Sequence, residues 1–332
     1  MFVGIDLHKR EAQVAIRNDD GELIEETRVK NEDLEEIAEE YAGGEALLEA
    51  TTNYYYVYDL LSEHLDVKVG HPPKLKAIAQ THKKTDRLDA EELSRLLWLG
   101  SVPESYVPTD EIRECRSLVR GRISLLQERT KYANKIHSVL LDNGINCEVK
   151  PLSQRGREYL DELDLPAPWD ELLSSYLSVI ETLTEEIDVL DKRIEERAEG
   201  LRETQLLMTI PGVSHYTALV IYAELGDIDR FDAAKEVVRY VGLNPVVRES
   251  GDSRFEGGIS KNGPGKVRWL LVQAVHTAVH TVEDPYLSRF YHRLERRKNS
   301  QIAAVATARK LLVSIYHMLD RDEVYNPPGV TA

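Results

Sequence analysis

Four acidic residues in the first ninety positions have the types and the spacing needed for metal chemistry. Asp6 ends a short apolar run that begins at Phe2, and Glu49 ends the run Ala46–Leu48. A carboxylate at the end of such a strand points out of the sheet edge where open α/β folds bind ligands. An acid in that place needs a partner or an ion. Asp86 and Asp89 stand three residues apart at the start of an expected helix, so they share one face.

Each acid alone also has a structural explanation, because Asp86 suits a helix N-cap and Asp89 suits a first helical turn. Together, an acid on strand one, another on a later strand and a pair on a following helix form the RNase H-like arrangement. Carboxylate oxygens are suitable ligands for Mg²⁺, with Mn²⁺ as an alternative, and paired ions can clamp both sides of a phosphodiester. We therefore expect Asp6, Glu49, Asp86 and Asp89 to hold metal and to be catalytic.

A basic, glycine-rich segment in the last third could meet a phosphate. Arg248–Ser253 is followed by Gly257–Lys266, where glycine allows close backbone approach and Lys and Arg can pair with the anion. A flexible basic loop would have the same composition. Thr209–Leu225 also resembles a helix-hairpin-helix, although a glycine loop between packed helices fits equally well. The candidate nucleic-acid contacts are Lys83, Lys84, Gly212, Arg248, Ser260, Lys261, Lys266, Arg268, Arg296 and Arg297.

The elements that must position these groups differ along the chain. The first hundred residues predict three strands with tight turns, then strands alternating with helices, which is typical of a mixed α/β sheet. The expected strands are 2–6, 12–17, 22–29, 45–51 and 66–70, and the expected helices are 33–41, 55–64 and 89–99. The remainder reads as helical, with helices at 111–141, 269–282 and 301–318, and a break at 143–168.

A heptad pattern marks the middle of the chain. Apolar residues recur with 3-4 spacing on an otherwise charged helix, at Leu173, Tyr176, Ile180, Leu183, Ile187, Leu190 and Ile194. This seam fits an intramolecular helical hairpin or an intermolecular coiled coil. We expect three domains: residues 1–100 with the acids, a helical coiled-coil dimerisation region at 101–200, and a mainly helical domain at 201–332.

Bulk properties limit the function classes. The net charge is −16, which argues against nucleic-acid binding, yet Val247–Lys310 holds 12 Lys and Arg against 6 Asp and Glu. Acidic proteins are common in high-salt cytoplasm, so a halophilic source is a hypothesis. The two cysteines, Cys115 and Cys147, lack metal-ligand spacing. We expect a cytoplasmic protein with no membrane association, because neither a signal peptide nor a run of 18 apolar residues occurs.

The chain resembles the insertion-sequence transposases of the IS110 type, the DEDD recombinases guided by a bridge RNA. The matching segments are GIDLHK at Gly4–Lys9, LLEAT at Leu47–Thr51, KTDRLDA at Lys84–Ala90, TIPGVSHYTA at Thr209–Ala218, and YVGLNPVVRESG through GGISKNG at Tyr240–Gly263. They occur in the family's order and cover essentially the whole chain. The run from Thr51 to Tyr56 departs from the family, which usually has glycine before an aromatic residue.

The resemblance implies an RNase H-like, RuvC-like first domain with the acidic tetrad at the four acids above, and a C-terminal transposase domain. It also implies that Ser250 is the nucleophile, with Ser253 and Ser260 as rivals, and that attack on DNA leaves a serine–phosphate link. Donor and target DNA, a structured guide RNA, and a homodimer assembling to a tetramer would be the partners.

Three other functions compete with a recombinase. A RuvC-like nuclease would hydrolyse DNA with the same acids and ignore Ser250. A nucleic-acid-binding scaffold would have an inert site. A sugar-kinase or actin-like ATPase is suggested by Gly4–Asp6, but the further glycine motifs of that fold do not occur.

Overall fold

The computed structural model describes residues 1–51, 53–78, 86–146, 150–250 and 253–327, and the chain divides into two compact units, Met1–Val107 and Pro108–Ala332. Helices from the expected middle region and from the expected C-terminal region share one hydrophobic core within the second unit. The three-domain division stays a prediction.

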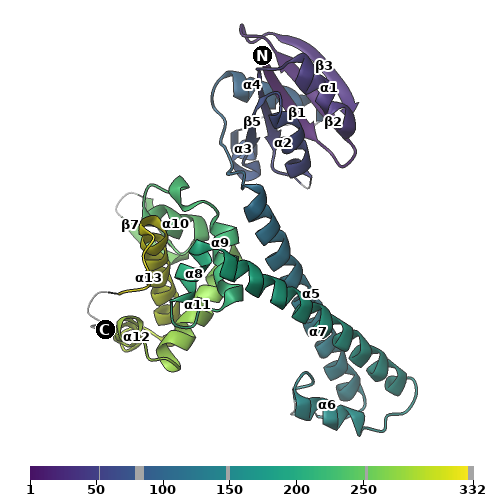
Figure 1. The fold of residues 1–332 in the computed structure, drawn as a ribbon, viewed down its shortest axis with the longest axis vertical. Coiled ribbons are helices and arrows are strands. Elements are labelled where there is room, and N and C mark those ends of the chain that lie inside the picture. The colour runs from purple at the N-terminus through teal and green to yellow at the C-terminus, as the bar shows by residue number, and fades with distance from the viewer. Residues whose placement is uncertain (52, 79–85, 147–149, 251–252, 328–332) are drawn as a thin grey trace. The chain divides into compact units, whose positions relative to one another are not determined.

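The first unit is built on a five-stranded mixed sheet in the order β3-β2-β1-β4-β5 (Figure 1). β1 pairs antiparallel with β2, which pairs antiparallel with β3, whereas β4 and β5 run parallel to β1. The mixed sheet expected from the sequence is confirmed. Its strands are β1 (Phe2–Leu7), β2 (Glu11–Arg17), β3 (Leu23–Lys30), β4 (Glu45–Glu49) and β5 (Asp66–Gly70).

Helices cover both faces of this sheet. Alternation in β1 directs Val3, Ile5 and Leu7 to one face, where they pack with α1 (Leu34–Glu40) and α2 (Tyr54–Ser62). On the other face, Leu47 packs with α3 (Pro72–Ile78) and α4 (Asp86–Trp98). A 3-10 turn, η1 (Asn31–Asp33), precedes α1. Asp6 and Glu49 belong to the face covered by α4, since they alternate with Ile5 and Leu48.

Two long helices, α5 (Asp110–Asp142) and α7 (Trp169–Gly200), form a hairpin in the second unit (Figure 1). Leu173 and Ile180 pack with Ile136 and Leu140 of α5, so the heptad seam is covered within the chain at these positions. The short helix α6 (Gln154–Asp161) lies where the sequence indicated only a break. Its Ser153 N-cap accepts from the Gly156 amide, which is a local signal that the hydrophobic pattern did not reveal.

The rest of the second unit is mainly helical, as expected. Within Thr209–Leu225, the chain turns after α8 and then forms α9, which runs to Leu225. The glycine-rich segment contains a two-stranded hairpin, which the sequence did not indicate because its strands have no alternating pattern. The elements are α8 (Arg202–Met208), α9 (His215–Leu225), η2 (Ile228–Arg230), α10 (Ala234–Val241), β6 (Pro245–Ser250), β7 (Ser253–Ile259), α11 (Gly265–His280), α12 (Pro285–Glu295) and α13 (Ser300–Arg321).

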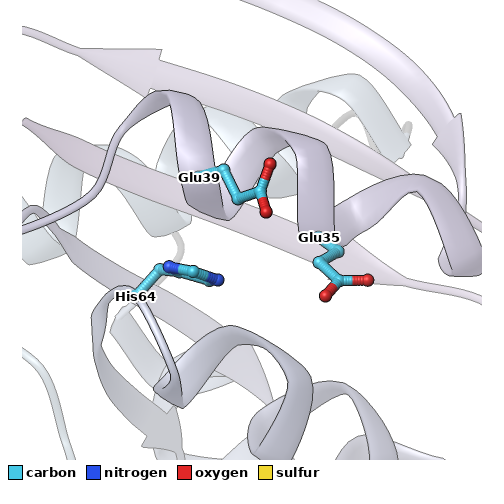
Figure 2. Close-up of side chains that lie close together, drawn as sticks. All are labelled: Glu35, Glu39 and His64. Atoms are coloured by element: carbon cyan, nitrogen blue, oxygen red, sulfur yellow. The ribbon is translucent and has the colours of Figure 1, made fainter.

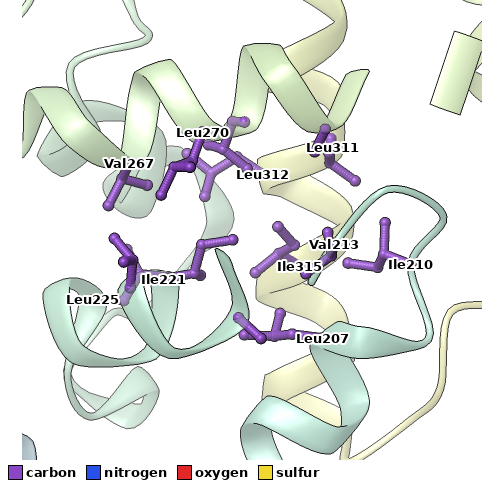
Figure 3. Packing of buried hydrophobic residues seen from close by; sticks show 14 of the residues in the cluster. Leu207, Ile210, Val213, Ile221, Leu225, Val267, Leu270, Leu311, Leu312 and Ile315 are labelled. Atoms are coloured by element: carbon purple, nitrogen blue, oxygen red, sulfur yellow. The ribbon is translucent and has the colours of Figure 1, made fainter. Parts of the chain in front are cut away.

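The core of the second unit gathers α9, α11 and α13. Ile221 and Leu225 of α9 lie opposite Val267 and Leu270 of α11, beside the side chains of α13 (Figure 3). Among the described residues, α13 is the one helix long and apolar enough to cross a membrane, with 22 residues and a mean hydropathy of 1.3. Half of its apolar window is buried inside the protein, and Leu312 and Ile315 are fully buried, as in a core helix.

Candidate active site

Asp6 and Glu49 lie at the same edge of the sheet. β1 and β4 are neighbouring parallel strands, and their last registered pair is Ile5 with Leu48. The next residue on each strand is an acid, so the two carboxylates follow adjacent strands at their carboxyl ends. Both residues are partly buried. The sequence predicted each strand end, and the parallel register places them side by side.

The second pair of acids comes from α4, which lies directly on β1. A Cβ built on Gly4 would stand 2.3 Å from both the carbonyl oxygen of Ala90 and the amide nitrogen of Ser94. A residue with a side chain at position 4 would therefore hold α4 away from the sheet. Asp89 immediately precedes the residue in this contact. Asp86 begins the helix, and its side chain lies outside the described part of the structure.

The direction of α4 brings its amino end toward the acidic edge. Near the C-terminal end of α4, Trp98 donates from Nε1 to the Asp19 carbonyl, in the turn that follows β2. Arg17, paired with Phe2 at the start of β1, donates to Ser94 Oγ at 3.2 Å and contacts Glu91 at 3.1 Å. The helix therefore runs antiparallel to β1, and its first turn points toward Asp6. Gly4 and Arg17 both position this helix, and no local pattern in the sequence indicated that role.

His8 contacts the first acid. Its Nε2 lies 3.3 Å from Oδ2 of Asp6, whose side chain is 15% exposed. Since His8 comes two residues after Asp6, the imidazole stands on the same side of the chain. The imidazole is therefore placed to orient the Asp6 carboxylate.

Compact groups of three metal-ligand atoms occur elsewhere among the described residues. One consists of Glu35 and Glu39, one turn apart on α1, and His64 after α2 (Figure 2). The other consists of Glu195, Glu199 and His215. In each group the ligand atoms lie within 4.8 Å of one another, but both glutamates are exposed. The described acids Asp6, Glu49 and Asp89 do not form such a group, so their ligand oxygens are not all within 4.8 Å of one another.

Ser250 ends β6, where it pairs with Ser253 across the hairpin. The preferred nucleophile and its first rival therefore stand opposite each other at the end of a two-stranded ribbon. The side chains of Arg248, Ser250 and Ser253 lie outside the described part of the structure. The acids belong to the first unit and the serines to the second.

The segment after β7 is fixed to the end of α10. The Ser260 amide donates to Asn244 O at 2.9 Å, and Ser260 Oγ donates to Asn244 Oδ1 at 2.7 Å. A Cβ on Gly263 would stand 1.9 Å from the Tyr240 carbonyl, so only glycine allows this approach. The Ser260 hydroxyl is therefore already engaged in a hydrogen bond with Asn244.

Arg268 stabilises the same segment from α11. Its Nη1 donates to Val241 O at 2.7 Å, to Asn262 O at 2.5 Å and to Gly263 O at 3.3 Å. Burial lowers the pKa of this guanidinium below its usual value. A guanidinium that satisfies three carbonyls is well placed to shape the loop. Its expected contact with nucleic acid stays a prediction.

The other candidate contacts have varied surroundings. Gly212 has φ +86°, and a Cβ there would meet the Ala274 carbonyl and Thr277 of α11 at 2.9 Å, so this glycine serves helix packing. Lys83 and Lys84 lie outside the described residues. Exposed side chains suited to phosphate contacts occur at Lys261, Lys266, Arg296 and Arg297.

A mixed sheet with acids at the carboxyl ends of β1 and β4 and a covering acidic helix defines an RNase H-like domain of the DEDD class. Comparison with known families agrees. A DEDD transposase model of the IS110 type matches residues 3–143, and a model of the IS116/IS110/IS902 transposase family matches residues 204–292. The chain belongs to this family of insertion-sequence transposases.

Relatives match over nearly the full length. The chain is 25% identical to a probable family 20 transposase of Pseudomonas aeruginosa, over 98% of both chains. It is also 25% identical to the transposase for insertion sequence element IS1111A of Coxiella burnetii, over 98% of this chain and 91% of the relative. A third relative, the transposase for insertion sequence element IS1328 of Yersinia enterocolitica, is 24% identical over 93% of this chain and 94% of the relative. A transposase binds DNA, and a DEDD nuclease domain implies a divalent metal.

Proposed function

We propose that this transposase cleaves and exchanges DNA strands with Mg²⁺ held by Asp6, Glu49, Asp86 and Asp89, and with Ser250 as the nucleophile. The observation that carries the proposal is the parallel β1–β4 register, which puts Asp6 and Glu49 on one edge, together with the Gly4 contact that directs α4 toward it. The donors are all carboxylate oxygens, the ligand chemistry that Mg²⁺ prefers, and Mn²⁺ would also suit them. When bound, the metal would stabilise charge on the reacting phosphate.

The chemical step assigned to Ser250 conserves phosphodiester bonds. Its Oγ forms a bond to phosphorus while a P–O bond of the DNA strand breaks, and the hydroxyl proton passes through water to the leaving oxygen. A hydroxyl at another strand end can then displace Ser250, which restores its proton and joins the new strands. Two such transesterifications exchange strands without an external energy source.

The partners follow from this chemistry and from the resemblance to guided recombinases. We infer that the protein acts in the cytoplasm on donor and target DNA, directed by a structured RNA, as a homodimer that assembles to a tetramer. Half-buried Leu183 and Leu190 on α7 support a further helix contact, because they continue the heptad seam beyond Tyr176, which packs against Tyr132 of α5. The segment 101–200 would then serve dimerisation.

The test compares single substitutions in a recombination assay on plasmid DNA. Asp6→Asn, Glu49→Gln and Ser250→Ala should each abolish recombination and leave the unfolding transition unchanged. Denaturing gels should reveal a covalent protein–DNA adduct with the wild type and none with Ser250→Ala. Normal recombination by Ser250→Ala would remove the serine mechanism, and normal activity of Asp6→Asn would remove the metal site.

A hydrolytic RuvC-like endonuclease is the second candidate. The observation in its favour is that all four acids belong to the first unit, whereas Ser250 belongs to the second. Such an enzyme would cut DNA normally after Ser250→Ala and would leave no covalent adduct. The same gels therefore separate the two functions.

A further inference from the structure

A cleft of about 460 Å³ lies in the first unit, around the loop that follows Asp6. Its walls come from the β1–β2 turn, from the end of β3 with η1, and from the start of α2. The β1–β2 turn and α2 follow the carboxyl ends of β1 and β4, and η1 follows β3, which runs parallel to β1. The cleft therefore belongs to the same edge as Asp6 and Glu49. The lining residues are Lys9, Arg10, Lys30, Asn31, Glu32, Asn53 and Tyr56.

The cleft is continuous with the acidic edge through hydrogen bonds. Asn31 donates from Nδ2 to the carbonyl oxygen of His8 at 3.0 Å, and its backbone amide donates to Arg10 O at 3.1 Å. The His8 imidazole lies 3.3 Å from Asp6. His8 therefore connects Asn31 in the cleft wall to Asp6.

Asn31 has an acceptor that nothing in the described structure satisfies. The residue is 8% exposed, and its buried Oδ1 has no hydrogen-bond partner among the described residues. The orientation of the amide is fixed, because a flip would place Oδ1 against the His8 carbonyl. A buried acceptor in a cleft wall is open to a donor from a bound molecule. A nucleobase amino group and a sugar hydroxyl are both such donors.

The cleft is basic in an acidic surrounding. Residues 1–107 hold 12 Lys and Arg against 23 Asp and Glu, yet three cations line this one cleft. Lys30 pairs with Glu32 at 3.1 Å, which neutralises the single acid in the lining. Lys9 and Arg10 are exposed, and within the described part of the chain neither makes an ion pair. They remain available to a phosphate.

An exposed aromatic ring completes the lining. Tyr56 on the first turns of α2 is 58% exposed, in a helix whose Val57 and Leu61 are buried. An exposed aromatic beside unpaired cations is typical of single-strand nucleic-acid sites, where bases stack on rings while Lys and Arg follow the backbone.

We propose that this cleft binds one nucleotide unit of a single strand at the flank of the acidic site. The base stacks on Tyr56, Lys9 and Arg10 meet the adjoining phosphates, and Asn31 Oδ1 accepts from a base amine or a sugar hydroxyl. The inference rests on the proposed function in one respect: it takes the acidic edge at Asp6 and Glu49 to be the site where the bound strand reacts.

The test measures fluorescence anisotropy of labelled twelve-residue homopolymers (dC, dU and rU) with the full-length protein in EDTA. Tyr56→Ala should raise the Kd about tenfold, within the range of a lost stacking contact, and Tyr56→Phe should retain near wild-type affinity. Lys9→Ala with Arg10→Ala should reduce the slope of log Kd against log salt by about 1.4, since each single-strand phosphate contributes about 0.7. Lys192→Ala, an exposed lysine on α7, is the control and should leave affinity unchanged.

The three homopolymers identify the donor. Tighter binding of dC than of dU assigns the Asn31 contact to a base amine, and tighter binding of rU than of dU assigns it to a sugar hydroxyl. Equal affinities for all three would overturn that contact. Wild-type affinity of Tyr56→Ala, or no binding by the wild type, would overturn the site.

A second readout locates the strand directly. Irradiation with a 5-iodouracil oligonucleotide and peptide mapping should give an adduct at Tyr56, and adducts confined to Pro108–Ala332 would contradict the proposal. Because EDTA removes any metal, these results are independent of catalysis. If Tyr56→Ala does not change the Kd, the nucleotide site is wrong but the strand-exchange proposal is unaffected. If Asp6→Asn is active, the metal site is wrong but the nucleotide site is unaffected.

Discussion

Gly4 of β1 and Ser94 of α4 are in backbone contact, with the Ser94 amide nitrogen 2.3 Å from the place that a Cβ on Gly4 would occupy. The absence of a side chain at position 4 is therefore what seats α4 on the sheet. The first turn of that helix holds Asp86 and Asp89, so one glycine governs the position of half of the proposed acidic tetrad.

Gly4→Ala should destabilise the first unit by about 1–3 kcal/mol, as overpacking against a fixed backbone does. The matched control is Gly121→Ala on α5, where an added Cβ meets nothing within 4 Å and helix propensity should add about 1 kcal/mol of stability. Hydrogen exchange followed by mass spectrometry gives the stability of each unit separately. Unchanged protection of β1 and α4 in Gly4→Ala would contradict the close packing.

Arg268→Lys should loosen the segment from Ser260 to Gly263, because an ammonium cannot reproduce the guanidinium contacts with Val241, Asn262 and Gly263. We expect faster hydrogen exchange at the Ser260 and Lys261 amides and a large loss of recombination.

The dependence of DNA affinity on salt distinguishes two roles of Arg268, which are holding the segment from Ser260 to Gly263 and contacting a DNA phosphate. Arg268→Lys keeps the positive charge, so the slope of log Kd against log salt should stay at the wild-type value. Lys266→Ala should lower that slope by about 0.9 if this exposed lysine contacts a duplex phosphate. Normal amide exchange in Arg268→Lys would refute the structural role.

Arg120 and Glu224 form a bidentate ion pair, in which Nε lies 2.8 Å from Oε1 and Nη2 lies 2.9 Å from Oε2. Glu224 is 8% exposed. Arg120→Ala leaves a largely buried carboxylate without this partner and should cost about 1–3 kcal/mol of unfolding free energy. Adding Glu224→Gln should recover part of the loss, since the amide is neutral. Urea denaturation of the four proteins in a double-mutant cycle measures the coupling, and strict additivity would exclude it.

Cys115 is 1% exposed, and burial raises the pKa of its thiol above the ordinary value of 9.0, although the Arg197 hydrogen bond lowers it. Thiolate is the reactive form, so native protein at pH 8 should react very slowly with Ellman's reagent at this position and rapidly in urea. A Cys147→Ser background isolates the signal. Rapid native labelling of Cys115 would contradict its burial.

The half-buried residues of α7 test the proposed dimer. Leu183→Glu with Leu190→Glu should lower the mass measured by light scattering and leave helicity unchanged. Ile187→Glu is the contrasting variant, because Ile187 is 2% exposed within the hairpin and its replacement should unfold it. An unchanged mass with both leucines replaced would exclude this face of α7 as the dimer contact.

The sequence by itself determined the elements with a local period and the acids attached to them. Alternation and turn residues gave five strands close to their observed bounds, and 3.6-residue periodicity gave the long helices. Asp6 and Glu49 could be found because each ends its own apolar strand, which is a local feature. Residue types and order also sufficed for the family, which the comparisons confirm. The hairpin β6–β7 and helix α6 were missed, since a strand without alternation depends on its partner and a short helix on its cap.

Only the tertiary structure decided which distant groups meet. The contact of Arg17 with Ser94 joins residues 77 positions apart, and Gly4 contacts the same helix. Such approaches depend on register, helix direction and the space left by a missing Cβ, none of which is encoded in a local pattern. The same is true of Arg268, whose charge suggested phosphate but whose guanidinium lies among carbonyls. Asn31 gave no signal in the sequence, because an unsatisfied acceptor exists only once the chain around it has folded.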